Sequence, residues 1–211
     1  MTNSFYSNIL KLESFASKYP TIESLVETLY LQAILEAYRH INDNEKVDGL
    51  LENDIRNKFT HHFKHHSSFL KKYINNRTIF LTKENEVYTR DETQRTDIEF
   101  FSSGHGNIFV VECKRLKSAE TRYVNGMEKF IELSYSEKDN YAGMLGFIIK
   151  GKPKKIVETL RSKVKNFHPS NGMEEIIKQK CVNWELSFKS KHVRKNEINV
   201  QFYHLFFDFI D

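Results

Sequence analysis

The sequence predicts an α/β fold with a mixed central sheet, and three observations along the chain lead to this prediction. Apolar residues recur at helical spacing through the first 76 residues. After residue 78 the period shortens, and between residues 95 and 101 the side chains alternate in the way that is typical of a strand. The elements expected after that run in the order strand, helix, strand, helix and hairpin, so parallel and antiparallel pairs should share one sheet.

The composition is that of a globular chain with a mild basic excess. The chain has 211 residues, of which 39% are hydrophobic and 28% are charged, and its formal net charge is +4. This length suits one domain with a sizeable core, and the charge permits a polyanionic partner without requiring one. The two cysteines, Cys113 and Cys181, are far apart, which favours free thiols over a disulfide or zinc framework. Because we find no signal-peptide pattern and no long apolar stretch, we expect a cytoplasmic protein that does not enter a membrane.

We predict a single domain over residues 1–211, built from three stretches. Residues 1–44 form a helical extension, residues 45–150 form the core, and residues 151–211 add a helix and a C-terminal β-hairpin.

The helical stretch has recognisable boundaries. Pro20 ends a first helix, and Thr21 can cap the second, because its hydroxyl can accept from free amides of the first turn. A third helix should carry apolar residues from Val47 to Phe63 and extend as far as Tyr73.

The strands are expected from residue 78 onward. The run 95–101 places Asp97 on one face and Ile98 on the other, and the turn chemistry of residues 102–107 predicts antiparallel pairing with a strand at 108–114. Further elements are expected at 119–133 (helix), 144–149 (strand) and 154–164 (helix), followed by strands at 182–188 and 198–206 that are joined by the basic connector 189–195.

Three charged residues in the central hairpin do not suit a purely structural strand. Asp97 lies among β-forming residues, although Asp is depleted in strands, and Glu112 and Lys114 interrupt an apolar strand near its end. Period two puts Glu112 and Lys114 on one face and turns the Cys113 side chain toward the core. Two facing carboxylates repel unless a positive group lies between them. A Mg²⁺ ion, with Mn²⁺ as a substitute, would meet that need, and the main-chain carbonyl of Cys113 is a further candidate ligand.

These residues resemble the motif of the restriction-endonuclease-like PD-(D/E)XK nuclease superfamily. Asp97 is followed, after a spacer of 14 residues, by Glu112-Cys113-Lys114 at the end of an apolar strand. The sequence departs from the full motif by having Thr96 where the motif has proline. The resemblance implies a three-layer core of helix, three strands, helix and strand over residues 45–150. It also implies Mg²⁺-assisted hydrolysis of a phosphodiester bond, with Lys114 as the catalytic amine.

Some members of that superfamily carry a further glutamate in the first core helix. Glu52 suits this place as a third catalytic carboxylate and metal ligand, and Asp54, on the other edge of the apolar stripe, is the competing choice. Arg95, Arg115 and Lys117 lie near the motif and could contact a nucleic-acid backbone or simply be surface charges.

The segment from Tyr123 to Met144 is similar to bacterial members of the superfamily that are linked to phage defence. The resemblance therefore implies a nuclease of restriction or phage defence, and DNA is the expected substrate. Cutting both strands would be simplest for a homodimer, and a partner subunit of a defence system is the other expectation.

Other interpretations of the same residues stay open. The three motif residues could form a cross-strand ion-pair cluster on a solvated face. The histidines at 61, 62, 65 and 66 could suggest zinc, but a zinc protease needs Glu at position 62, so a solvated or phosphate-contacting helix face is the favoured interpretation. At the level of function, the alternatives are a nucleic-acid-binding module without turnover and an assembly subunit of a larger complex.

Overall fold

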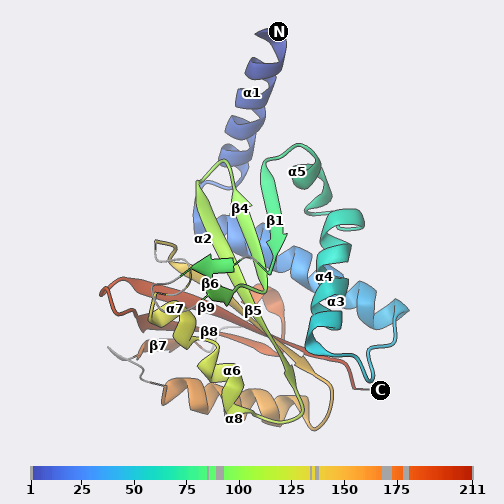
Figure 1. Cartoon of the computed structure of the whole chain (residues 1–211), viewed down its shortest axis with the longest axis vertical. Coiled ribbons are helices and arrows are strands. Elements are labelled where there is room, and N and C mark those ends of the chain that lie inside the picture. Colours follow the sequence, from blue (N-terminus) through green and yellow to red (C-terminus); the bar gives the residue numbers. More distant parts are fainter. Residues whose placement is uncertain are drawn as a thin grey trace.

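The protein is an α/β structure with a mixed sheet, as the sequence predicts (Figure 1). A computed structural model describes residues 2–84, 86–88, 93–133, 135, 138–167, 173–177 and 181–210. In this part of the chain, seven strands form one sheet in the order β1-β4-β5-β6-β9-β8-β7, and β2 and β3 form a separate pair. The strands are β1 (Ile79–Lys83), β2 (Glu86–Tyr88), β3 (Thr93–Arg95), β4 (Ile98–Ser102), β5 (Asn107–Leu116), β6 (Tyr141–Ile148), β7 (Met173–Ile177), β8 (Ser187–Val193) and β9 (Asn199–Asp208).

Helices cover the sheet, and one of them projects from the body. Figure 1 shows α1 extending away from the rest of the molecule, whereas α3 and α4 lie on one side of the sheet and α6 to α8 on the other. The helical segments are α1 (Thr2–Lys18), α2 (Ile22–Leu25), the π-helical turn η1 (Val26–Tyr30), α3 (Leu31–Asn44), α4 (Glu52–His65), α5 (Lys71–Asn75), α6 (Thr121–Asn125), α7 (Glu128–Ile131), α8 (Pro153–Lys165) and the short 3₁₀ turn η2 (Cys181–Asn183). Among the described residues, none of the helices has the length and apolar character needed to cross a bilayer.

The sheet is mixed because antiparallel pairs flank a parallel centre. Strands β4 and β5 pair antiparallel, as predicted from the turn between them, and Ile98 lies opposite Val111. Strand β6 then runs parallel to β5, since the helices α6 and α7 carry the chain back across the sheet. Strand β9 is parallel to β6, and β8 closes the predicted C-terminal hairpin against β9.

Successive residues of the central strands pack in two separate cores, one on each face of the sheet. On β5, Val111 and Cys113 belong to the cluster that includes α3 and α4, whereas Val110 and Leu116 belong to the cluster under α6 to α8. Period two explains this division, because successive side chains of a strand leave opposite faces of the sheet. The sheet is therefore covered on both faces near its centre.

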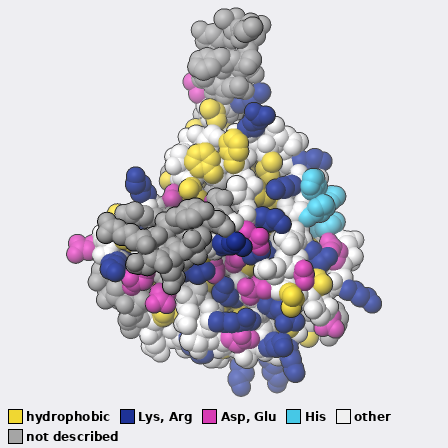
Figure 2. Space-filling view, viewed as in Figure 1, with side chains coloured by type: hydrophobic (Ala, Val, Ile, Leu, Met, Phe, Trp, Pro, Cys, Tyr) yellow, Lys and Arg dark blue, Asp and Glu magenta, His cyan; other side chains and the backbone are white. Residues whose placement is uncertain are grey.

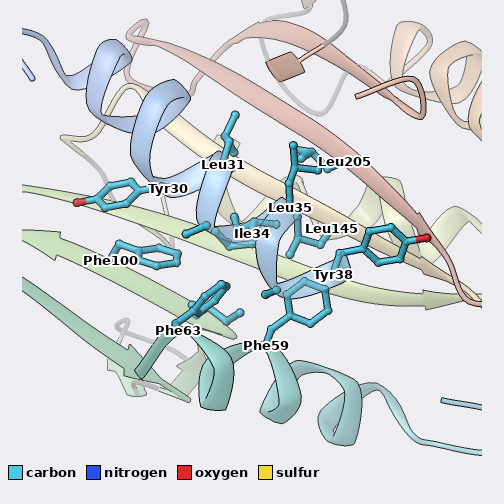
Figure 3. Packing of buried hydrophobic residues seen from close by; sticks show 14 of the residues in the cluster. Tyr30, Leu31, Ile34, Leu35, Tyr38, Phe59, Phe63, Phe100, Leu145 and Leu205 are labelled. Atoms are coloured by element: carbon cyan, nitrogen blue, oxygen red, sulfur yellow. The ribbon is translucent and has the colours of Figure 1, made fainter. Parts of the chain in front are cut away.

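The larger core is rich in aromatic side chains (Figure 3). Phe59 and Phe63 of α4 point toward α3 and the sheet, and the ring of Phe63 lies 5.5 Å from that of Phe100 on β4. Tyr30 stacks on Phe100 with centroids 4.7 Å apart. Burial of such large rings is a major stabilising contribution, and it fixes α4 against the strands that carry the candidate site.

Two helix predictions have different outcomes. Thr21 caps the second helical segment as predicted, because its hydroxyl accepts from the Ser24 amide at 3.0 Å. The third helix is wrong at both ends: α4 begins at Glu52 and ends at His65. At the start, Gly49 adopts a φ of 77°, which interrupts a helix. Past the end of α4, a separate short helix, α5, follows.

The predictions for the chain after residue 78 need three corrections. The run 95–101 is not continuous, because β3 ends at Arg95 and β4 begins at Ile98. The predicted helix 119–133 is two short helices, α6 and α7. In the tail, the basic connector is largely the strand β8 itself, and the predicted strand at 182–188 is mostly the turn η2 and a bend, although Phe188 belongs to β8.

Candidate active site

The pairing of β4 with β5 brings Asp97 and Glu112 to neighbouring positions. Ile98, the first residue of β4, is paired with Val111, and Asp97 and Glu112 are the residues next to this last pair. One carboxylate oxygen of Asp97 accepts from the Cys113 amide at 2.7 Å, which fixes Asp97 against the strand that carries Glu112.

Glu112 is the most deeply placed acidic group of the site. Its side chain is 2% exposed, and its Oε1 accepts from Lys114 Nζ at 2.6 Å and from Lys129 Nζ at 3.1 Å. Its other oxygen, Oε2, is buried and has no hydrogen-bond partner among the described residues. A buried carboxylate oxygen without a partner is costly, so this atom is the notable feature of the site.

The surroundings raise the pKa of both Glu112 and Lys114, for different reasons. Burial, and then the negative charge of Asp97, raise the pKa of Glu112, while Lys114 and Lys129 act in the opposite direction. Burial alone would lower the pKa of Lys114, but the nearby carboxylates, Glu112 first, raise it above its usual value. Lys114 is therefore an ammonium group held among carboxylates.

The predicted orientation of the strand is confirmed. Glu112 and Lys114 leave the same face, and Lys114 Nζ also donates to the Cys113 carbonyl at 3.1 Å. The Cys113 side chain points into the core, and its complete burial raises the pKa of the thiol well above its usual value. The thiol is thus inert, whereas its carbonyl lies at the site.

Glu52 and Asp54 are separated by the structure into different places. Glu52, at the first position of α4, accepts from the Arg115 amide at 2.7 Å, and its other oxygen lies 3.9 Å from Lys114 Nζ. Asp54 instead accepts from the amide of Leu51 and caps its own helix. Of the two carboxylates, Glu52 is the one that joins Lys114.

Comparison with known protein families, with curated proteins and with solved structures finds no match. The interpretation of the site therefore depends on its own geometry and chemistry.

Three residues for which the sequence predicts no role at the site contact it or its neighbours. Arg56 of α4 donates to the second oxygen of Asp97 and to Glu84, and the guanidinium is almost fully buried. Lys129 of α7 contacts Glu112 and donates to the Tyr135 hydroxyl at 2.9 Å. Tyr135 in turn donates to the carbonyl of Arg95. A lysine and an arginine on predicted helices are normally solvated, so only the fold reveals these contacts.

The three residues predicted to contact nucleic acid lie in different surroundings. Arg115 lines a hollow of about 300 Å³ with Glu52 and Arg122. The side chain of Arg95 is exposed, next to the gap between β3 and β4. Lys117 lies farther along, at a second hollow of about 400 Å³ beside Lys152.

The histidine cluster belongs to a different region of α4. His61 and His65 lie side by side, with ring centroids 4.6 Å apart, and line a hollow with lysines. His62 is buried against α3, where its Nε2 lies 3.5 Å from Glu36, so the prediction of a fully solvated face is wrong for this residue. Burial lowers the pKa of His62 despite the charge of Glu36.

The described residues contain no group of three or more His, Cys, Asp or Glu side chains arranged to hold a metal ion. The donors present are instead two facing carboxylates, Asp97 and Glu112, and the carbonyl of Cys113. A set of one or two carboxylates completed by other oxygen ligands is the type that Mg²⁺ uses with a phosphate substrate. The buried Oε2 of Glu112 is the atom that fits such an ion.

Proposed function

We propose that this chain hydrolyses phosphodiester bonds of nucleic acid with the help of Mg²⁺, most simply as a DNA endonuclease of restriction or phage defence. The observation that carries the proposal is the pair of facing carboxylates, one of which keeps a buried, unpartnered oxygen while a lysine ammonium lies 2.6 Å from its other oxygen. Two acidic groups with an amine beside them form the donor set that metal-assisted phosphoryl chemistry needs.

The order of elements gives further support. Helix α4, strands β1, β4 and β5, helices α6 and α7, and strand β6 follow one another along the chain. This order agrees with a restriction-endonuclease-like core, with the pair β2 and β3 inserted before β4. We propose that core as the scaffold of the site.

The side chains would divide the work as follows. Asp97, Glu112 and the Cys113 carbonyl would hold Mg²⁺ or Mn²⁺, which when bound polarises a phosphoryl oxygen and acidifies a water. Lys114, whose ammonium is a strong donor, would orient the attacking water and offset negative charge on the phosphoryl group. Glu52 would position Lys114 from the far side.

The proposed reaction forms one bond and breaks one. The oxygen of a water molecule bonds to phosphorus, a P–O bond of the nucleic-acid backbone breaks, and the departing oxygen takes up a proton. The products are a phosphate monoester end and a hydroxyl end, with no covalent enzyme intermediate.

A plasmid-nicking assay tests the proposal. In millimolar Mg²⁺ or Mn²⁺ we expect conversion of supercoiled plasmid by the wild-type protein, and a loss of about a hundredfold or more for both Asp97→Ala and Lys114→Ala, since each removes a group that acts on the reacting phosphate. The rate is read from gel densities over time.

A matched control is available on α4. Lys64→Ala removes an exposed lysine from the same protein without touching the site, and it should leave the rate within about twofold of wild type, as an exposed substitution usually does. Cleavage that survives both site substitutions, or that persists in excess chelator, would contradict the proposal.

A binding module without turnover is the second candidate, and one observation favours it. Asp97 is already paired with Arg56, and Glu112 with Lys114 and Lys129, so the acidic charge is balanced without a metal. Calorimetric titration with Mg²⁺ separates the two candidates, because the binding module predicts no heat and the nuclease predicts saturable binding that Glu112→Gln abolishes.

A further inference from the structure

Two phenylalanines lie exposed and side by side on neighbouring strands. Phe80 on β1 is the cross-strand partner of Phe101 on β4, and their ring centroids are 6.1 Å apart. Phe80 is 45% exposed and Phe101 is 38% exposed. The pair lies at the edge of the sheet, because β1 is the edge strand and β4 is its neighbour. Large exposed apolar side chains at such a place often mark a binding site.

These rings are on the same face of the sheet as Glu112. Phe101 is paired with Ile108 on β5, and Glu112 lies four residues after Ile108 in the same strand, an even number, so Phe101 and Glu112 leave the same face. Phe100 enters the core of the opposite face. At roughly 3.3 Å per residue along β5, the level of the rings lies about 13 Å from Glu112. Phe80 and the exposed Thr82 continue this face along the edge strand.

The surroundings of the aromatic pair suit a polar, negatively charged ligand. Figure 2 shows hydrophobic side chains gathered over β1 and β4, with basic and acidic side chains farther down the same view. At the ends of β1 and β4, a hollow of about 220 Å³ is lined by Lys11 and Arg77 together with Ser103. Basic side chains that are free of the acidic pair therefore lie beyond the end of the strands that carries the rings, next to Ser103.

A second copy of the chain fits this face less well. A stable protein interface buries about 800 Å² on each partner. The exposed pair supplies only two half-exposed rings, and the side chains around it, such as Arg77 and Thr82, are polar and exposed. Two neighbouring rings match instead the size of one or two nucleobases, which stack on aromatic side chains in single-strand-binding proteins.

We propose that Phe80 and Phe101 form a stacking platform for unpaired bases of a nucleic-acid strand whose backbone continues to Asp97 and Glu112. The proposal rests on the proposed function, because it assigns a substrate class to the same site. A base must leave its helix to stack on a protein ring, so the preferred substrate is a single strand or a duplex with an unpaired segment next to the cleaved bond. The 13 Å separation corresponds to about four stacked nucleotides at roughly 3.4 Å each.

Binding without cleavage tests the platform separately from catalysis. Fluorescence anisotropy in EDTA compares a labelled 20-nucleotide oligo-dT strand with a blunt 20-base-pair duplex, using the full chain. We expect tighter binding of the single strand, and a loss of about tenfold or more in its affinity for the double variant Phe80→Leu with Phe101→Leu, because leucine keeps the position apolar but has no ring that can stack. The double variant Phe80→Trp with Phe101→Trp should retain the affinity.

Phe69→Ala is the matched control, since Phe69 is 36% exposed and lies between α4 and α5, away from this face. Unchanged affinity in the leucine variant, or equal binding of strand and duplex, would overturn the platform. It would also be overturned if light scattering showed that the wild type is a dimer and that the leucine variant is a monomer. If the leucine variant binds the single strand as well as the wild type does, and plasmid nicking is still observed, the platform is rejected and the nuclease proposal stands. If single-strand binding depends on the two rings but no nicking is observed, the nuclease proposal is rejected and the platform stands.

Discussion

Glu112 is both a buried residue of the sheet and a member of the candidate active site. The strand β5 buries its carboxylate almost completely, and two ammonium groups, from Lys114 and Lys129, approach one of its oxygens. Removing one partner of a buried ion pair is more damaging than the pair is stabilising, because the remaining charge stays away from water. The free energy of unfolding should therefore respond to Lys114 even when no substrate is present.

Lys114→Met provides a test of this point without an activity assay. Methionine keeps most of the length of the side chain and removes its charge, so Glu112 retains Lys129 alone. We expect a loss of about 1–3 kcal/mol in the free energy of unfolding. If a divalent cation binds between the carboxylates, millimolar Mg²⁺ should restore part of this loss by binding only the folded state. Urea unfolding with and without Mg²⁺ measures both effects.

The comparison variant is Lys64→Met, which should change neither the stability nor its response to Mg²⁺, because Lys64 is exposed on α4. Equal unfolding curves with and without Mg²⁺ in both the wild type and Lys114→Met would argue against a cation at this place.

Part of the site could be predicted at the residue scale. Asp97, Glu112 and Lys114 are conspicuous because charged residues interrupt β-forming runs, and the period of β5 fixes the common face of Glu112 and Lys114. Arg56 could not be predicted, since it lies 41 residues before Asp97 and reaches it only because the aromatic face of α4 packs on the sheet. Lys129 is missed for the same reason, because its contact depends on where α7 lies over β5.

At the scale of elements, the connection from α4 to α5 is held by a carboxylate of another helix. Glu36 of α3 accepts from the hydroxyls of Ser67 and Ser68 and from the Ser68 amide. These hydrogen bonds stabilise the chain where α4 has ended and α5 has not begun. The apolar spacing persists across this point and therefore predicts a continuous helix to Tyr73. The contact with Glu36 cannot be inferred from that spacing.

The Glu36 contact predicts a dependence of stability on pH. Burial tends to raise the pKa of Glu36, but the hydrogen bonds from Ser67 and Ser68 outweigh it, and the folded pKa lies below the usual value of 4.5. A lowered folded pKa means that the unfolded chain binds the proton first, so the contribution is present above pH 4.5 and is lost as the pH falls through the folded pKa. Glu36→Gln should therefore be less stable than wild type near neutral pH, and this difference should shrink in acid.

Urea unfolding at a series of pH values between 3 and 7 gives the measurement. Glu158→Gln, at an exposed position of α8, is the control and should follow the wild-type curve. A difference between Glu36→Gln and wild type that stays constant over the whole range would show that the carboxylate charge contributes nothing there.

The strand predictions show a similar limit. The β4–β5 hairpin and its parallel neighbour β6 could be predicted, because alternation, turn residues and an intervening helix are local signals. The boundary of β8 could not, since the Lys189 to Val193 segment is rich in charge and resembles a loop. Its strand conformation depends on pairing with β9, where Ser190 and His192 are buried, and such burial is not visible in composition.

At the scale of the whole molecule, the central strands connect the two cores. Leu145 on β6 belongs to the core with α3 and α4, whereas Met144 on the same strand belongs to the core under α8. The helices of residues 22–44 also contribute to the first of these cores, which contains Leu35 and Tyr38. Because both cores depend on the same strands, neither core should stay folded when the other unfolds. The chain should therefore unfold as one cooperative unit.

The single tryptophan makes this cooperativity measurable. Trp184 lies against the first core, with its ring centroid 5.4 Å from that of Tyr38 on α3. Leu160, on α8, is fully buried in the second core on the opposite face. Leu160→Ala should cost about 2–5 kcal/mol, and if the sheet couples the two cores, the urea midpoint read from Trp184 fluorescence should fall as far as the midpoint read from far-UV circular dichroism. A Trp184 midpoint that stays at the wild-type value while the dichroism shifts would mean that the faces unfold separately, and the single domain predicted for residues 1–211 would then be wrong.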